Sequence, residues 1–516
     1  MGVIARQSIK GALANYLGVA IGFFVSFFVL TKYLTQEEIG LTRVLVDAAM
    51  LFSSLAQLGT NSSIVKFFPW FKTDPSVSPS QADSSPKTGE QPVPNHGIFG
   101  LSLLLPLAGF TIFALAFLIF REPLLAVYSQ NAPLLADYFY LLPMLTFFAL
   151  YLAVFETNAS VLLRITVPKL VREVGIRLFN LAAYLLYGFD LISLDTFVWM
   201  FCASYGLAML LNIFYLFTLG HISFRIDRHF LTRDRVREIG RYTLFMTAAA
   251  LAGNIPLFNS LFLGAKAGLA LTGVYTIASY IANVVETPYR SLGAISRPVV
   301  AAAVKEDNWA EVNRLGRQVS LHQLLVSLLI FYVIWINIDA LFAVIPNGRD
   351  YVSGVGVVLL LGLAKALNSS LSIAGDILNF SRHYAWGLLF ITVLTVGAIV
   401  FNNLLIGPMG ISGAACATLF SYAINYTLLL SFLWIKLKVN ILSRAQLKMV
   451  ALIAVMLLLD WAWCRWLTPA MGVGVIAGAV LKTLILGSGT VALTVFLNIS
   501  PTVNNIIHHW VAKPRK

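Results

Sequence analysis

Residues 225–263, RIDRHFLTRDRVREIGRYTLFMTAAALAGNIPLFNSLFL, contain the pattern that decides the fold. Six arginines lie within 225–241, and an apolar segment extends over 239–263. A helix of about 20 apolar residues is long enough to cross the hydrocarbon core of a bilayer. A strongly basic connection at the start of such a segment is typical of the cytoplasmic entrance to a transmembrane helix.

Apolar segments of this length occur fourteen times along the chain. They span residues 11–31, 42–65, 98–120, 136–160, 171–188, 196–220, 239–263, 269–292, 318–339, 351–376, 384–404, 409–435, 447–466 and 472–497. Each is close to the length that a membrane-spanning helix needs. The sequence therefore predicts an all-α polytopic membrane protein with about fourteen transmembrane helices.

Lysine and arginine are distributed unevenly between the connections, taken alternately along the chain. The set of connections that includes the N-terminus holds 26 of the 36 basic residues, the other set holds 6, and 4 lie inside apolar segments. The positive-inside rule places the basic set in the cytoplasm. We therefore expect a multi-pass protein of the bacterial inner (cytoplasmic) membrane with both termini cytoplasmic.

The composition excludes an ordinary soluble domain, since 59% of the residues are hydrophobic and 11% are charged. The topology accounts for the net charge of +13, so anionic membrane lipids are expected partners and nucleic acid is not. The sequence contains no phosphate-binding Gly-Lys-Ser/Thr loop and no metal-ligand spacing of His and Cys. We expect no cofactor, no bound metal, no catalytic residue and no enzymatic activity.

A weak internal repeat appears when the chain is shifted by about 233 residues. The shift lays Gly40-Leu41-Thr42 over Gly273-Val274-Tyr275. Repeated halves are typical of transporters built from two related lobes. We expect an N-terminal lobe at 1–238, a C-terminal lobe at 239–438, and two further helices with a basic cytoplasmic tail at 439–516. The Pro- and Ser-rich stretch 73–96 within the first lobe predicts a disordered cytoplasmic loop.

Several motifs resemble one known family. Residues 403–418, NLLIGPMGISGAACAT, are similar to the junction of the eleventh and twelfth helices in polysaccharide-biosynthesis flippases. The stretches RQSIK at 6–10, EIGLTR at 38–43 and KFFP at 66–69 are similar to the start of oligosaccharide flippases. These flippases belong to the MOP superfamily, which also holds the O-antigen, lipid II and multidrug (MATE) exporters.

This resemblance implies a fold and a substrate class. The fold would be two pseudo-symmetric six-helix lobes in a V-shape, plus two C-terminal helices. The substrate would be a polyprenyl-diphosphate-linked oligosaccharide, moved across the inner membrane by alternating access for the assembly of surface polysaccharide or lipopolysaccharide. A coupling ion, H+ or Na+, and a polysaccharide polymerase with glycosyltransferases are the further partners that it implies.

Ionisable side chains inside a membrane cost about 3 kcal/mol or more near its centre, so they usually face a partner or a polar cavity. Lys365 is the most central basic residue, and its structural alternative is an ion pair with an acid such as Asp376. A diphosphate needs cationic contacts. The substrate-binding candidates are Lys365, Arg290, Arg43, Arg177 and Asn254, the last at an expected break in the seventh helix.

Five further residues are candidates for coupling or gating. They are Asp47, Glu156, Glu286, Asp376 and Pro288. Each acid also has a structural reading: Glu286 with Arg290 and Asp47 with Arg43 are spaced i, i+4, Glu156 and Arg177 could meet across adjacent helices, and Asp376 could be solvated at a helix end. Pro288 favours a kink in the eighth helix.

Two other functions remain open. An ion-coupled multidrug exporter of the MATE type would use unpaired carboxylates deep in the membrane. A multispanning glycosyl- or acyltransferase would need an active-site loop, and the exterior connections are short for one.

Overall fold

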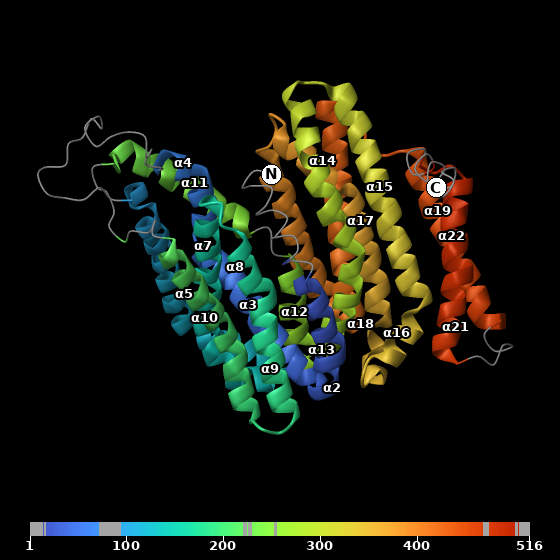
Figure 1. Cartoon of the computed structure of the whole chain (residues 1–516), viewed down its shortest axis with the longest axis horizontal. Helices are drawn as coiled ribbons and strands as arrows, with labels where there is room; N and C mark the ends of the chain where they lie inside the picture. Colours follow the sequence, from blue (N-terminus) through green and yellow to red (C-terminus); the bar gives the residue numbers. More distant parts are fainter. Residues whose placement is uncertain are drawn as a thin grey trace, which may run out of the picture. The chain divides into compact units, whose positions relative to one another are not determined.

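The computed structural model describes residues 14, 17–71, 94–219, 224, 230–251, 255–467, 474–500 and 504. These residues form helices and contain no β-strand (Figure 1). The chain divides into two compact units, 1–273 and 274–516. Residues 73–93 of the predicted loop 73–96 lie outside the described residues, so the disorder of this loop stays a prediction. The predicted lobe boundary at 238/239 also stays a prediction.

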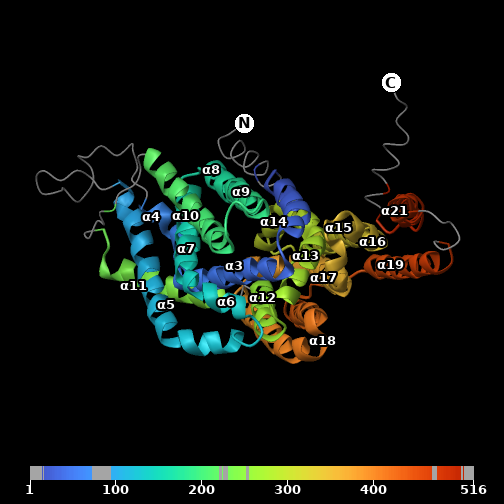
Figure 2. The same cartoon turned by 90° about the horizontal axis from the view of Figure 1, so that it is seen from below.

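The first unit contains the helices up to the start of α13. They are η1 (Val25–Leu30), α2 (Thr31–Tyr33), α3 (Gln36–Ala56), α4 (Thr60–Phe71), η2 (Pro94–Gly97), α5 (Ile98–Tyr128), α6 (Pro133–Tyr138), η3 (Phe139–Leu141), α7 (Leu142–Val161), α8 (Thr166–Leu170), η4 (Val171–Gly175), α9 (Ile176–Gly188), α10 (Leu194–Thr218), α11 (Arg233–Leu251) and α12 (Ile255–Lys266). Helix α7 is central in this unit, because it packs against α3, α5 and α10 (Figure 2).

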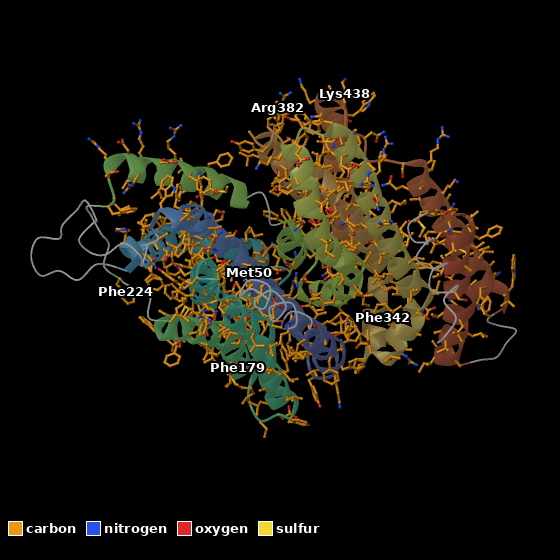
Figure 3. The ribbon with its side chains drawn as sticks, turned by 45° about the horizontal axis from the view of Figure 1, so that its top comes forward. Met50, Phe179, Phe224, Phe342, Arg382 and Lys438 are labelled. Carbon is orange, nitrogen blue, oxygen red and sulfur yellow. The ribbon has the colours of Figure 1, made fainter. Side chains whose placement is uncertain are left out.

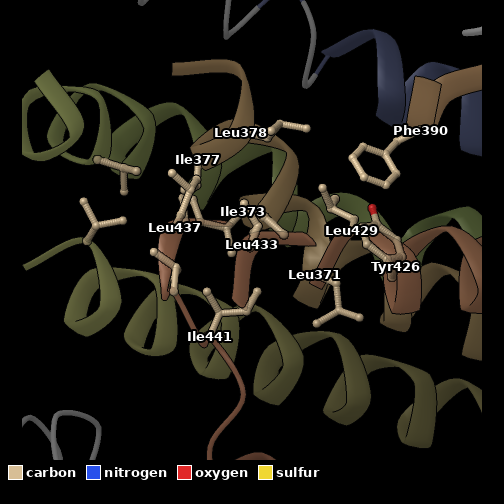
Figure 4. Close-up of a cluster of buried hydrophobic side chains, with 14 of the residues drawn as sticks. Leu371, Ile373, Ile377, Leu378, Phe390, Tyr426, Leu429, Leu433, Leu437 and Ile441 are labelled. Atoms are coloured by element: carbon tan, nitrogen blue, oxygen red, sulfur yellow. The ribbon is translucent and has the colours of Figure 1, made fainter. Parts of the chain in front are cut away.

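The second unit begins within α13 (Leu269–Asn283). Its other helices are η5 (Val284–Glu286), α14 (Thr287–Lys305), α15 (Trp309–Ile336), α16 (Ile338–Val344), η6 (Gly348–Gly354), α17 (Val355–Phe380), α18 (Trp386–Phe432), η7 (Leu433–Leu437), α19 (Arg444–Ala462), η8 (Trp463–Leu467), α21 (Val475–Lys482), η9 (Thr483–Gly487) and α22 (Ser488–Phe496). Helix α17 is central here and packs against α14, α15 and α18. Its Ile373 and Ile377 lie in a buried apolar cluster with Leu433 and Ile441 (Figure 4).

The all-α membrane fold is confirmed. Among the described residues, 10 helices are long and apolar enough to cross a membrane, and Leu17–Tyr33 is a shorter apolar helix. The described residues of the fourteen predicted apolar segments are largely helical.

The second predicted segment, 42–65, is not one continuous helix. Helix α3 ends at Ala56 and α4 begins at Thr60, with Leu58 at φ 48° and Gly59 at φ 65° between them. A Cβ on Gly59 would lie 2.5 Å from the carbonyl oxygen of Thr243 in α11. Gly59 thus packs closely against α11, and the break falls in the polar stretch 57–63, QLGTNSS, inside the predicted segment.

The glycine-rich stretch 403–418 forms the tight turn that its sequence predicts. Helix α18 covers two predicted segments, and Gly410 divides it with φ 57° and ψ −133°. A Cβ on Gly413 would overlap the carbonyl oxygen of Leu405. Gly410 therefore allows the left-handed backbone of the turn, and Gly413 lets the two helical halves meet closely.

Helix α3 and the start of α13 pack closely in the first unit, at positions that the predicted repeat relates to each other. A Cβ on Gly40 of α3 would overlap the backbone of Leu269, and a Cβ on Gly273 would overlap the backbone of Gln36. Gly273 is offset from Gly40 by 233 residues, and Leu269 is offset from Gln36 by the same number. The contact is therefore reciprocal between positions that the repeat makes equivalent, as expected of a crossing related by a pseudo-twofold axis.

One end of the second unit gathers basic connections. Figure 3 shows Arg382, after α17, and Lys438, after η7, at the same end of this unit, while Phe342 of α16 lies toward the other end. The backbone carbonyls of Lys438 and Asn440 accept hydrogen bonds from Asn313 and Arg317 at the start of α15. We call this the basic end of the second unit.

Candidate functional site

Two helices of the second unit face each other through polar side chains. The first carries Glu286, Tyr289 and Arg297 along η5 and α14, and the second carries Lys365, Asn368 and Asp376 along α17. Spacings of 3 and 11 residues return to the same side of a helix. Glu286 pairs with Lys365 and Arg297 pairs with Asp376, both at a sequence separation of 79. The two helices therefore run parallel in a constant register, and we call these six residues the polar ladder.

The deeper end of the polar ladder is a buried ion pair. Lys365 Nζ donates a hydrogen bond to Glu286 Oε2 at 2.7 Å, and the two side chains are 11% and 15% exposed. Asn368 Nδ2 donates to Glu286 Oε1 at 2.6 Å, and Tyr426 Oη donates to Asn368 Oδ1 at 2.6 Å. Both carboxylate oxygens are thus hydrogen-bonded, which offsets the cost of removing the pair from water.

Lys365 does form an ion pair with an acid, as its structural alternative predicts, but the partner is Glu286 on the facing helix and not Asp376. Lys365 and Asp376 lie on the same side of one helix, about 16 Å apart along its axis at 1.5 Å per residue. The i, i+4 pairing of Glu286 with Arg290 stays a prediction, because the side chain of Arg290 is outside the described part of the structure.

The other end of the polar ladder is more open. Arg297 Nε lies 3.1 Å from Asp376 Oδ2, with the side chains 42% and 17% exposed. Arg297 Nη2 also donates to the hydroxyl of Tyr289, and its guanidinium carbon lies 5.2 Å from the centre of that ring.

The first unit contains the predicted i, i+4 pair. Arg43 Nε lies 2.6 Å from Asp47 Oδ2 within α3, which confirms the local pairing. Ser260 of α12 donates to the same oxygen at 2.5 Å. Asp47 is 3% exposed, so a buried carboxylate links α3 to α12.

The predicted meeting of Glu156 and Arg177 is wrong. Glu156 of α7 pairs with Arg172 at 2.6 Å, and Arg177 of α9 pairs with Glu173 at 3.1 Å. The guanidinium of Arg177 instead lies against the first helix, where a Cβ on Gly22 would be 3.0 Å from its Nε. Gly18 and Gly22 of the first helix leave space for the Arg177 side chain. Arg177 is therefore turned away from Glu156.

The sequence-predicted residues therefore fall into separate groups. Arg43, Asp47, Glu156 and Arg177 lie in the first unit, and Lys365, Glu286 and Asp376 lie in the second. Asn254 is outside the described residues. Pro288 lies in the first turn of α14, directly after the 3₁₀ turn η5, which agrees with an irregular helix at that point.

Sequence reasoning did not identify Asn368, Tyr426, Tyr289 and Arg297 as site residues. Arg297 was counted only as part of a basic connection. Its position eleven residues after Glu286 matches that of Asp376 after Lys365 with the charges reversed, and this spacing is the signal that would have indicated it.

Among the described residues, no group of three or more His, Cys, Asp or Glu side chains is placed to hold a metal ion. The expectation of no cofactor stays a prediction.

Comparison with known proteins places the chain in a family. Residues 6–302 match the family described as Polysaccharide biosynthesis protein. No curated protein matches the chain by sequence.

Two solved structures share the fold. A structure titled "Lipid II flippase MurJ, inward closed conformation" aligns with a TM-score of 0.62 and 13% identity, covering 93% of this chain and 98% of that one. An inward-facing multidrug resistance MATE family transporter of the MOP superfamily aligns with a TM-score of 0.61 and 16% identity, covering 85% of this chain and 98% of that one. With more than half of its length matched by the family model, this chain belongs to the polysaccharide biosynthesis protein family, and it shares its fold with both of these structures.

Proposed function

We propose that this protein is a flippase that moves a polyprenyl-diphosphate-linked oligosaccharide from the cytoplasmic to the outer leaflet of the bacterial inner membrane. The family description supports a role in polysaccharide biosynthesis. The fold shared with a lipid II flippase supports transport of a lipid-linked substrate by alternating access. Surface polysaccharide or lipopolysaccharide assembly is the process that such a substrate would serve.

The observation that carries this proposal is the buried Lys365. A cation at this depth is costly, and the carboxylate of Glu286 neutralises it in the described state. A lipid diphosphate is an anion that can replace Glu286 as the partner of the ammonium group. The released carboxylate would then bind a proton or a sodium ion, and this exchange would couple transport to an ion gradient.

Several acids of the described membrane segments are paired with basic side chains. Asp47, Glu156, Glu286 and Asp376 each have an Arg or Lys partner. Asp460 of α19 pairs with Lys482 of α21 at 2.8 Å. A lipophilic cation would have to displace a basic side chain at each of these carboxylates, and an anion has to displace Glu286 or Asp376 from the cations of the polar ladder. The family description is therefore what favours the anionic, lipid-linked substrate.

Reconstitution separates the flippase from the alternative, a MATE-like multidrug exporter. The purified protein would be placed in proteoliposomes with a fluorescent polyprenyl-diphosphate oligosaccharide, and movement between leaflets would be followed by quenching from one side. The proposal predicts flipping of this lipid and no uptake of a lipophilic cation such as ethidium under an ion gradient. Cation transport without lipid flipping would establish the exporter instead.

A further inference from the structure

The two ion pairs of the polar ladder are arranged with opposite polarity. At the deep end the cation, Lys365, belongs to α17, and at the other end the cation, Arg297, belongs to α14. Each cation therefore has its carboxylate on the facing helix. Eleven residues separate the two pairs on both helices, which corresponds to about 16 Å.

The two cations differ in access. The Lys365 side chain is 11% exposed and the Arg297 side chain is 42% exposed. Arg297 lies in the C-terminal half of α14, which ends at Lys305. The next helix, α15, begins at Trp309, and its start lies at the basic end of the second unit. An anion that approaches from the basic end of the second unit therefore meets Arg297 before it can reach Lys365.

The chemistry of Arg297 suits an organic phosphate. A guanidinium carries five N–H donors in a planar fork that matches phosphate oxygens. The contacts to Asp376 and Tyr289 use two different nitrogens, Nε and Nη2. Tyr289 and Asp376 hold the group in place while leaving part of it accessible, and Asn368 and Tyr289 continue the polar side chains between the two pairs.

We propose that Arg297 is a capture site for the diphosphate, from which the anion passes along the polar ladder to Lys365. This inference rests on the proposed function, since it gives that substrate a first binding position. Arrival of the diphosphate displaces Asp376 from Arg297, and transfer to Lys365 restores the Arg297–Asp376 pair as Glu286 is displaced. The competing explanation is a purely structural ion pair at a helix end. Ion pairs as exposed as this one contribute little to stability, which argues against that explanation.

Three variants test the capture site in the reconstituted full-length protein. Arg297→Gln should raise the substrate concentration for half-maximal flipping about tenfold, because one charge-assisted contact to the diphosphate is lost. Asp376→Asn should lower that concentration, since the guanidinium no longer has a competing carboxylate. Arg382→Gln, which removes an exposed arginine at the same basic end, is the matched control and should leave it unchanged.

Direct binding of farnesyl diphosphate, titrated to the detergent-solubilised protein, separates this inference from the proposed function. If the wild type flips the lipid and Arg297→Gln does so at the same substrate concentration for half-maximal flipping, the capture site is overturned and the proposed flippase function is retained. Binding of farnesyl diphosphate that is lost in Arg297→Gln, in a protein that flips no lipid, would overturn the function and support the site. A lower substrate concentration for half-maximal flipping in Asp376→Asn, together with an about tenfold higher one in Arg297→Gln, supports both the capture site and the proposed function.

Discussion

At the scale of single residues, Glu286 accepts hydrogen bonds from Lys365 and Asn368 with a different carboxylate oxygen for each, and Tyr426 orients the amide of Asn368. A buried polar network is stable when every member is satisfied, and losing one donor costs more than the bond alone contributes. The sequence indicated Lys365 and Glu286 as unusual charges but not their pairing, because nothing in one helix specifies which neighbour it faces.

Tyr426→Phe should destabilise the protein by about 1 kcal/mol, since it leaves the Asn368 carbonyl without its hydroxyl donor. Thermal unfolding of the purified protein in detergent measures the effect. Tyr422→Phe is the matched control: Tyr422 lies one turn earlier and is 7% exposed, against 8% for Tyr426, and the hydroxyl that donates to Asn368 is that of Tyr426. Equal losses in both variants would contradict the assigned role of Tyr426.

At the scale of elements, hydrophobic length predicted where the helices lie, and glycine chemistry predicted the turn at Gly410. The break between α3 and α4 falls in the polar stretch 57–63, QLGTNSS, which hydrophobic length alone passes over, and the close approach of Gly59 to Thr243 of α11 required coordinates. The repeat of 233 residues predicted equivalent halves, yet the reciprocal crossing of Gly40 and Gly273 with Leu269 and Gln36 required coordinates.

Gly40→Ala should destabilise the first unit by about 1–3 kcal/mol, because the added methyl group overlaps the Leu269 backbone and forces α3 away from α13. The yield of folded protein and its unfolding temperature report the change. Gly240→Ala in α11 is the control, since a Cβ at Gly240 meets nothing within 4 Å. Wild-type stability for Gly40→Ala would show that the crossing is looser than described.

At the scale of the whole molecule, the charge distribution predicts that the connections with Arg382 and Lys438 lie on one side of the membrane, and both residues lie at the same end of the second unit. The cytoplasmic location of that end stays a prediction. The site could be predicted only in part. The predicted depth of each charged residue in the membrane indicated these residues individually. Which of them meet in the polar ladder, and that Arg43 and Asp47 form a separate pair, depends on helix packing that sequence periodicity does not encode.

Cysteine labelling in intact cells tests the topology. In a variant without Cys202, Cys416 and Cys464, a cysteine introduced at Lys438 should be protected from an impermeant maleimide, and one at Asn347, on the opposite side by our assignment, should react. The reverse pattern would place the basic end outside the cell and contradict the positive-inside assignment.

The most direct test of the central claim compares Lys365→Ala with the double variant Lys365→Ala/Glu286→Gln in the flipping assay. Removing only the lysine strands a buried carboxylate, so the single variant should lose protein as well as activity, and Glu286→Gln should restore the amount of membrane-inserted protein. If Lys365 contacts the diphosphate, the restored protein still does not flip the lipid, while Lys365→Arg keeps partial activity because it keeps the charge. Full flipping by the double variant would show that the pair is structural and would contradict the assignment of Lys365 as the anion contact.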